Sequence, residues 1–143
     1  MGESIEFLQY LDEKMELPDK DLREYSPLVL AYMGDAIYEL IIRTVLVKKG
    51  NMQVQKLHKK ASALVKAEAQ ANLIERILPL LTEEEVKIYK RGRNAKSCTK
   101  AKNATMIDYR KATGMEALAG YLYLKKDTQR LLDLVWEGLK EVL

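Results

Sequence analysis

The apolar residues of this chain recur every three or four positions, and this periodicity constrains the fold more than any other feature. Residues at that spacing share one face of an α-helix, whereas a half-buried strand needs strict alternation. The sequence contains no convincing run of alternating β-branched residues. The pattern therefore predicts an all-α protein. Its 143 residues suit a single domain over 1–143, because independently folding domains mostly contain about 100–150 residues.

Capping residues, prolines and glycines predict where the helices begin and end. Ser26 and Pro27 supply an N-cap and a first-position proline for a long helix through residues 28–47, which Gly50 ends. Thr82 and Glu85 have the spacing of a capping box. The other predicted helices span 4–15, 51–78 with Asn51 as cap and a bend near Val65, 83–97 with fraying or a turn at Gly92, 106–112, 114–125 and 128–142, and a loop covers 98–105.

Several classes of protein are excluded by what the chain lacks. The longest apolar run, residues 28–42, contains Asp35 and Glu39 and is too short and too charged to span a bilayer. The N-terminus is acidic where a secretory signal would be basic. Cys98 is the only cysteine, which excludes an intramolecular disulfide and a multi-cysteine zinc site. We therefore expect a cytoplasmic protein without a membrane partner.

Positive charge is concentrated in two segments, although the net charge is only +3. Residues 40–67 and 86–107 each contain seven lysines and arginines and no aspartate or glutamate. Such acid-free stretches predict a surface for a polyanion, since phosphate contacts are the usual reason for one. From charge alone, two solvated helix faces would explain the pattern equally well.

Two acidic residues interrupt apolar segments that also contain small residues. Asp35 lies between Gly34 and Ala36, and Glu116 lies one helical turn from Gly120. A carboxylate deep in an apolar helix carries a desolvation cost unless it has a partner. Small residues allow two helices to approach closely, so these segments can cross with their carboxylates converging. The alternative for each acid is an ordinary ion pair or a place on a helix face.

Convergent carboxylates would bind a hard divalent cation. Mg²⁺ prefers oxygen ligands, keeps several waters and needs only one or two carboxylates, and we expect Mn²⁺ to substitute for it. Such an ion beside RNA favours phosphodiester hydrolysis. Asp35 and Glu116 are therefore the predicted metal ligands and catalytic residues. His58, the only histidine, lies among lysines that disfavour an imidazolium, so we interpret it as an RNA contact or a surface residue rather than a catalytic base.

Several motifs, in order, resemble the Mini-ribonuclease III branch of the ribonuclease III family. The glycine-aspartate pair at Gly34 and Asp35 is similar to the family's signature helix, and the run from Arg91 to Ser97 is the most specific match. The segments that carry the resemblance are residues 28–36, 57–62, 90–97, 109–110 and 116–122.

This resemblance implies an all-helical ribonuclease III endonuclease fold without a separate double-stranded-RNA-binding domain. It implies a homodimer that cuts both strands of an RNA duplex and matures the large-subunit (23S) ribosomal RNA precursor, with a ribosomal protein on the substrate as a further partner. Tyr32 on the signature helix becomes a candidate dimer contact, with a core aromatic as the alternative. Ala31 and Thr113 stand where ribonuclease III usually has two more acids, which indicates a leaner metal shell.

The basic segments are the predicted RNA-binding surface. Duplex RNA offers a shallow minor groove and regular phosphates that a helical dimer can recognise by shape and charge. An alternative role for Arg91 and Arg93 is to brace the active-site helices by pairing with carboxylates. The predicted RNA contacts are His58, Lys59, Lys60, Arg91, Arg93, Asn94, Lys96, Lys100 and Lys102.

Two other functions are compatible with the sequence. A non-catalytic RNA-binding or ribosome-assembly protein on the same fold is permitted by the reduced acid set. A helical protein-interaction module is the third candidate, and it predicts no salt-sensitive affinity for RNA. A cleavage assay on duplex RNA separates these hypotheses.

Overall fold

The computed structural model describes residues 7–95 and 105–143, and every regular element in them is a helix. This confirms the predicted all-α class. The predicted start of the first helix at Ser4 and most of the predicted loop, from Cys98 to residue 104, lie outside the described residues. The α-helices are α1 (Phe7–Lys14), α2 (Pro27–Lys49), α3 (Val54–Val65), α4 (Ala67–Ile77), α5 (Glu83–Asn94), α6 (Met106–Leu124) and α7 (Thr128–Leu139), and the short 3-10 helices are η1 (Leu22–Glu24) and η2 (Leu78–Leu80).

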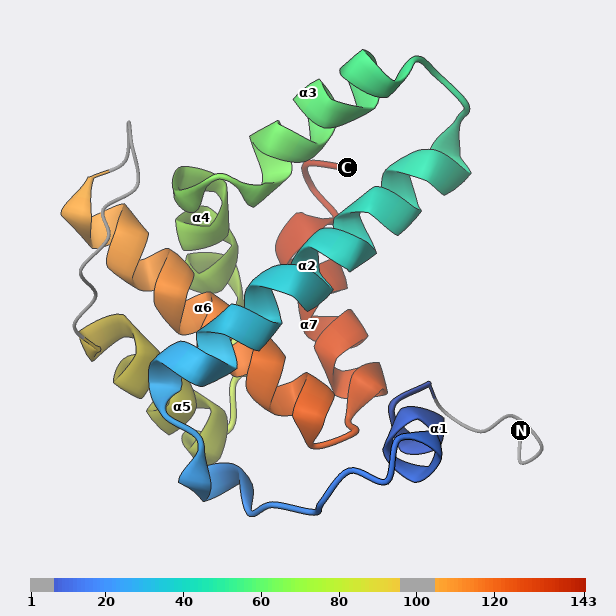
Figure 1. Cartoon of the computed structure of the whole chain (residues 1–143). Helices are drawn as coiled ribbons and strands as arrows, with labels where there is room; N and C mark the ends of the chain where they lie inside the picture. Colours follow the sequence, from blue (N-terminus) through green and yellow to red (C-terminus); the bar gives the residue numbers. More distant parts are fainter. Residues whose placement is uncertain (1–6, 96–104) are drawn as a thin grey trace.

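Helix α6 is the centre of the fold. It packs against α2, α4, α5 and α7, and ten of its residues are buried. Figure 1 shows α2 running across α6, while α3 and the C-terminal half of α2 extend together to one side of the bundle. Because α6 touches so many neighbours, a residue on it can meet side chains from several elements. Within the described residues no helix is long and apolar enough to cross a membrane.

The predicted capping residues start their helices as expected. Ser26 Oγ accepts a hydrogen bond from the Val29 backbone N–H at 3.2 Å, and Pro27 occupies a first-turn position of α2. Thr82 Oγ1 accepts from the Glu85 N–H at 3.1 Å, and Glu85 Oε1 accepts from the Thr82 N–H at 2.9 Å. This reciprocal pair is the capping box. Both helix starts are therefore encoded by a few adjacent residues.

Two glycines, Gly92 in α5 and Gly114 in α6, serve close packing, although fraying or a turn was expected at Gly92. The prediction of separate helices on either side of Thr113 is wrong, because α6 continues through this position. A Cβ on Gly114 would lie 2.6 Å from the Tyr89 ring, and one on Gly92 would lie 2.7 Å from the Ala117 Cβ. Helices α5 and α6 therefore pack closely where each has a glycine. Gly92 is buried inside α5 and does not end it.

The predicted helix over 51–78 is divided close to the expected bend. Helix α3 ends at Val65, and Lys66 is at once its C-cap and the N-cap of α4. The backbone at Lys66 is extended, so the chain turns there without a loop. The proposed cap at Asn51 is wrong, since α3 begins after Gln53, whose side chain makes no capping bond. We call the junction at Lys66 the α3–α4 elbow.

Candidate active site

Two glycines allow α2 and α6 to cross almost backbone to backbone. A Cβ on Gly34 would overlap the carbonyl oxygen of Glu116, and a Cβ on Gly120 would overlap the carbonyl oxygen of Leu30. No side chain larger than hydrogen fits at either position without separating the helices. The small residues beside the two predicted carboxylates thus create the crossing.

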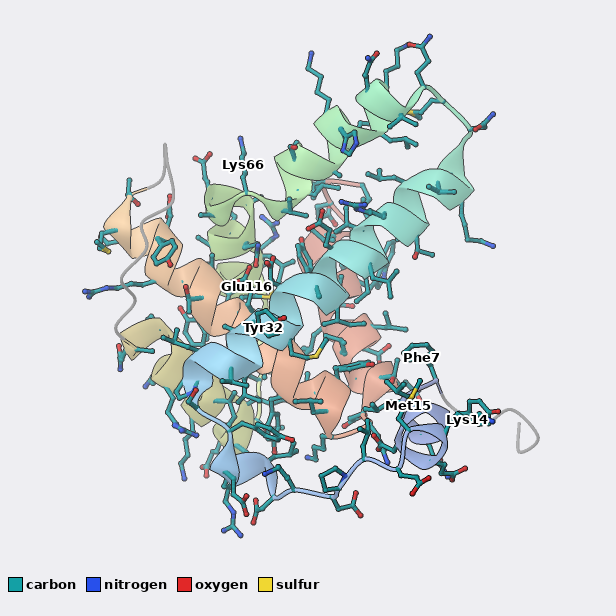
Figure 2. The ribbon with its side chains drawn as sticks, in the orientation of Figure 1. Phe7, Lys14, Met15, Tyr32, Lys66 and Glu116 are labelled. Atoms are coloured by element: carbon teal, nitrogen blue, oxygen red, sulfur yellow. The ribbon has the colours of Figure 1, made fainter. Side chains whose placement is uncertain are left out.

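This crossing brings Asp35 on α2 next to Glu116 on α6. Burial raises the pKa of Glu116 to about 8, and the negative charge of the adjacent Asp35 contributes to the rise. Asp35 itself is exposed, so the expectation that it lies deep in apolar surroundings is wrong. The desolvation cost falls on Glu116, which is half-buried. Figure 2 shows Glu116 where α6 passes α2, with Tyr32 on α2 and Lys66 at the elbow.

Gln70 on α4 is the third side chain at this site, and the sequence analysis missed it. Its Nε2 donates to Glu116 Oε2 at 3.2 Å and to the carbonyl oxygen of Val65 at 2.7 Å. The hydrogen bond from Gln70 to Glu116 opposes the rise in the pKa of Glu116. Gln70 shares the buried face of α4 with Leu73, Ile74 and Ile77. An amide within an apolar stripe at helical spacing was the signal available in the sequence.

The donor set fits a divalent cation with few protein ligands. Neither Asp35 nor Glu116 forms an ion pair with any residue in 7–95 or 105–143. The buried Oε1 of Gln70 also has no hydrogen-bond partner in those ranges. Across the same residues no three His, Cys, Asp or Glu side chains gather as a metal site. Two uncompensated carboxylates suit Mg²⁺, which retains most of its waters.

The two positions at which the resemblance led us to expect further acids are enclosed by protein. Ala31 is buried in α2, and Thr113 is buried in α6, where its hydroxyl donates to the Tyr109 carbonyl at 3.0 Å. Neither residue offers an anionic oxygen to the site. The described acidic set is therefore limited to Asp35 and Glu116.

The predicted RNA contacts on α3 lie on its exposed surface. Lys59 and Lys60 are both exposed. His58 is exposed as well, but it also lines an apolar groove between α2 and α3 with Arg43 and Leu57. The structure therefore places two lysines where phosphates can reach them and gives His58 a mixed environment.

The predicted contacts at the end of α5 differ in how they are held. Arg91 and Asn94 are exposed. The Arg93 guanidinium lies 5.6 Å from the centre of the Tyr89 ring, and its Nε donates to Asn94 Oδ1 at 3.2 Å. No carboxylate of the described residues pairs with Arg91 or Arg93. The further predicted contacts Lys96, Lys100 and Lys102 lie outside the described residues.

Tyr32 projects from α2 into solvent and is 81% exposed. The alternative that it is a core aromatic is therefore wrong. Val29, Leu40 and Val47 are exposed on the same helix. Their positions recur at helical spacing, so they form an apolar stripe along α2 together with Tyr32.

Comparisons with known proteins agree with the fold and with the motifs. The Ribonuclease III domain family matches residues 28–127. A Mini-ribonuclease 3 of Clostridium tetani is 51% identical over 84% of this chain and 80% of that protein. A Mini-ribonuclease 3 of Brevibacillus brevis is 49% identical over 88% of this chain and 93% of that protein. A crystal structure of a Fusobacterium nucleatum protein has a TM-score of 0.78 and 35% identity, covering 87% of this chain and 100% of that one.

Proposed function

Because the chain belongs to the ribonuclease III family, we propose that it is a divalent-metal-dependent enzyme that cleaves double-stranded RNA at Asp35 and Glu116. The family assignment makes it an endoribonuclease of the Mini-ribonuclease 3 type. The observation that carries the finer proposal is the convergence of two carboxylates at the α2–α6 crossing with no cation paired to them in the described residues.

Asp35 and Glu116 would hold Mg²⁺, with Mn²⁺ as a substitute. A bound ion of this kind supplies a stronger nucleophile from water at neutral pH and offsets charge that develops on the phosphate. Glu116 presents its carboxylate from α6 at the buried centre of the fold, while Asp35 on α2 is exposed to solvent. The scissile phosphate would therefore approach the ion from the exposed side, where Asp35 lies. Glu116 would bind the ion from the buried side.

The apolar stripe on α2 supports a homodimer. An exposed row of large apolar residues on a helix is unfavourable in water and commonly marks an interface. Tyr32 lies one helical turn from Asp35, so a second copy seated there would place two active sites near each other. Substituting Tyr32→Asp is expected to yield monomers in sedimentation equilibrium. A variant that stays dimeric would remove Tyr32 from the interface.

Lysines on α3 and cations at the end of α5 form the proposed RNA surface. Lys59, Lys60 and Arg91 are exposed, and none of them forms an ion pair with another described residue. Charge reversal at Arg91 and Arg93 is expected to weaken binding to duplex RNA and to reduce its salt dependence. Unchanged affinity and salt dependence would exclude this segment from the binding surface.

The proposed substrate is the precursor of the large-subunit (23S) ribosomal RNA. The enzyme would cleave it in the cytoplasm, with a ribosomal protein bound to the RNA. The support is the match to Mini-ribonuclease 3 proteins, whose motifs this chain shares over most of its length. A dimer that recognises duplex RNA by its shape would bind the double-stranded stems of a structured precursor.

A cleavage assay tests the central proposal. The wild-type protein is expected to cut a long RNA duplex with Mg²⁺ and to stop when EDTA is added, while a single-stranded RNA of the same sequence stays intact. Asp35→Asn and Glu116→Gln variants should bind the duplex without cutting it. If both variants are folded and cut as well as wild type, the catalytic assignment is wrong. Duplex binding by wild type without cleavage under any divalent cation would favour the non-catalytic alternative.

A further inference from the structure

Gln70 is buried at the point where the α3–α4 elbow meets the active site. It is 2% exposed, and its single amide nitrogen bridges the Glu116 carboxylate and the Val65 carbonyl. Both of its N–H groups are used, one toward each acceptor. The contact with the Val65 carbonyl fixes the orientation of the amide, because a carbonyl oxygen only accepts and therefore needs the nitrogen beside it.

Besides the bond from Gln70, a second side-chain hydrogen bond holds the elbow, and it involves no residue of the active site. Tyr38 on α2 donates its hydroxyl to the carbonyl oxygen of Leu64 at 2.9 Å. Leu64 and Val65 are the last two residues of α3, where carbonyls have no partner within the helix. Tyr38 and Gln70 thus each donate a hydrogen bond to one of two neighbouring carbonyls at the end of α3. Of these two side chains, only Gln70 also donates to Glu116.

Holding Gln70 in this orientation leaves its Oε1 buried without a hydrogen-bond partner in the described part of the chain. A buried polar atom in that condition costs about 1–3 kcal/mol. An apolar side chain of similar size would avoid this cost, although it would release the Val65 carbonyl. The arrangement is therefore poorly explained by stability alone, and residues that break a local rule tend to lie at functional sites.

We propose that Gln70 is a positioning residue that fixes the direction of the Glu116 carboxylate for binding the divalent cation. This inference rests on the proposed metal-dependent function. Metal binding requires the charged form of Glu116, which is repelled by the charge of Asp35. Without the hydrogen bond from Nε2, the charged Glu116 side chain can rotate away from Asp35. Gln70 opposes that rotation from α4. It also connects the geometry of Glu116 to the elbow that orients α3, on which Lys59 and Lys60 lie.

The direct test compares Gln70→Met with Tyr38→Phe as a matched control. Each substitution removes one side-chain bond to the end of α3, so both are expected to lower the midpoint of urea unfolding to a similar, small extent. Partners that orient metal ligands typically contribute 10–100-fold to metal affinity or activity. Gln70→Met should therefore weaken Mn²⁺ binding, measured by electron paramagnetic resonance without RNA, by about 10–100-fold. Tyr38→Phe should leave it unchanged.

Cleavage kinetics give a second readout. Gln70→Met is expected to lower kcat at fixed Mg²⁺ while KM for the duplex stays close to wild type, since the substitution removes no exposed cation. Gln70→Leu is measured alongside it, so that a packing defect specific to one side chain is recognised. The same loss of Mn²⁺ affinity in Tyr38→Phe would show that the elbow alone matters and would overturn the proposal.

A double-mutant cycle isolates the contact with Glu116. In a Glu116→Gln background, adding Gln70→Met should cause no further loss of Mn²⁺ affinity, because the bond that it removes no longer positions a ligand. Equal losses in both backgrounds would overturn the proposal, as would unchanged Mn²⁺ binding in Gln70→Met or unfolding of both Gln70 variants. Failure of wild type to bind Mn²⁺ would instead refute the proposed metal-dependent function.

Discussion

Glu85 and Glu116 are both shielded carboxylates, but their surroundings are opposite. Glu85 is 6% exposed and accepts hydrogen bonds from the Arg130 guanidinium at 2.8 and 2.9 Å and from the Thr82 backbone at 2.9 Å. The hydrogen bond from Arg130 is the main reason that the pKa of Glu85 falls below its usual value. Glu116 faces Asp35 instead, and burial raises its pKa to about 8.

The difference separates a carboxylate that stabilises the fold from one kept ready for a ligand. Glu85 links the start of α5 to α7, and its charge is compensated within the protein. Glu116 lacks a cationic partner among the described residues, and Gln70 is the side chain that donates a hydrogen bond to it there. Strongly perturbed carboxylates of the second kind concentrate at functional sites. Four measurements can break or sharpen this contrast.

The largest expected effect is on catalysis. Glu116→Gln should lower cleavage of duplex RNA by at least about 10³-fold, because losing a metal ligand removes several kcal/mol of transition-state stabilisation. Glu85→Gln, the same chemical change at the other site, should stay within a few-fold of wild type at a temperature where it is folded. Comparable activities in the two variants would show that the contrast has no functional meaning.

Stability should respond in the reverse order. Glu85→Ala leaves Arg130 without its carboxylate and should cost about 3 kcal/mol, at the lower end for a broken buried pair because Arg130 is partly exposed. Glu116→Gln should cost nothing at pH 8 without divalent cations. Urea unfolding of both variants at pH 8 in EDTA measures this, and a larger loss for Glu116→Gln would contradict the comparison.

The two sites should also give opposite pH dependences of the unfolding free energy. The folded pKa of Glu116 is raised from 4.5 to about 8, so its contribution to stability is present below pH 4.5 and is lost as the pH rises to 8. We expect a loss on the order of 2 kcal/mol over this window in EDTA, which Glu116→Gln abolishes.

Glu85 has a lowered folded pKa, so its contribution is present above the unfolded value of 4.5 and is lost as the pH falls further. Glu85→Gln should therefore flatten only the acid side of the stability curve. If both variants flattened the same side, the assigned directions of the pKa shifts would be wrong.

The smallest expected effect concerns the capping box. Thr82→Ala removes the side-chain acceptor for the Glu85 N–H and should cost about 1 kcal/mol, the usual value of an N-cap. Arg130 still binds Glu85 in this variant, so cleavage should be unchanged. Thermal unfolding together with the cleavage assay measures both quantities. A loss of activity at full folding would indicate that the α5–α7 link also shapes the active site.

Local patterns in the sequence were sufficient for much of the fold. Ser26, Thr82 and Glu85 predicted two helix starts, because a cap forms between residues only three positions apart. The small residues near Asp35 and Glu116 correctly indicated that two helices could approach there. Periodicity also predicted the all-α class, since helical spacing is a property of each segment by itself.

Contacts between distant segments decided the rest. Fraying or a turn was predicted at Gly92 and a break at Thr113, yet α5 and α6 continue through these positions, where Gly92 and Gly114 each receive a side chain from the other helix. The exposure of Asp35, the raised pKa of Glu116 and the orientation of Gln70 depend on how α2 and α4 pack against α6. The sequence determined the helices and the candidate carboxylates. Only tertiary packing decided which carboxylate is desolvated and which amide holds it, because burial and hydrogen bonding depend on neighbours that spacing along the chain does not specify.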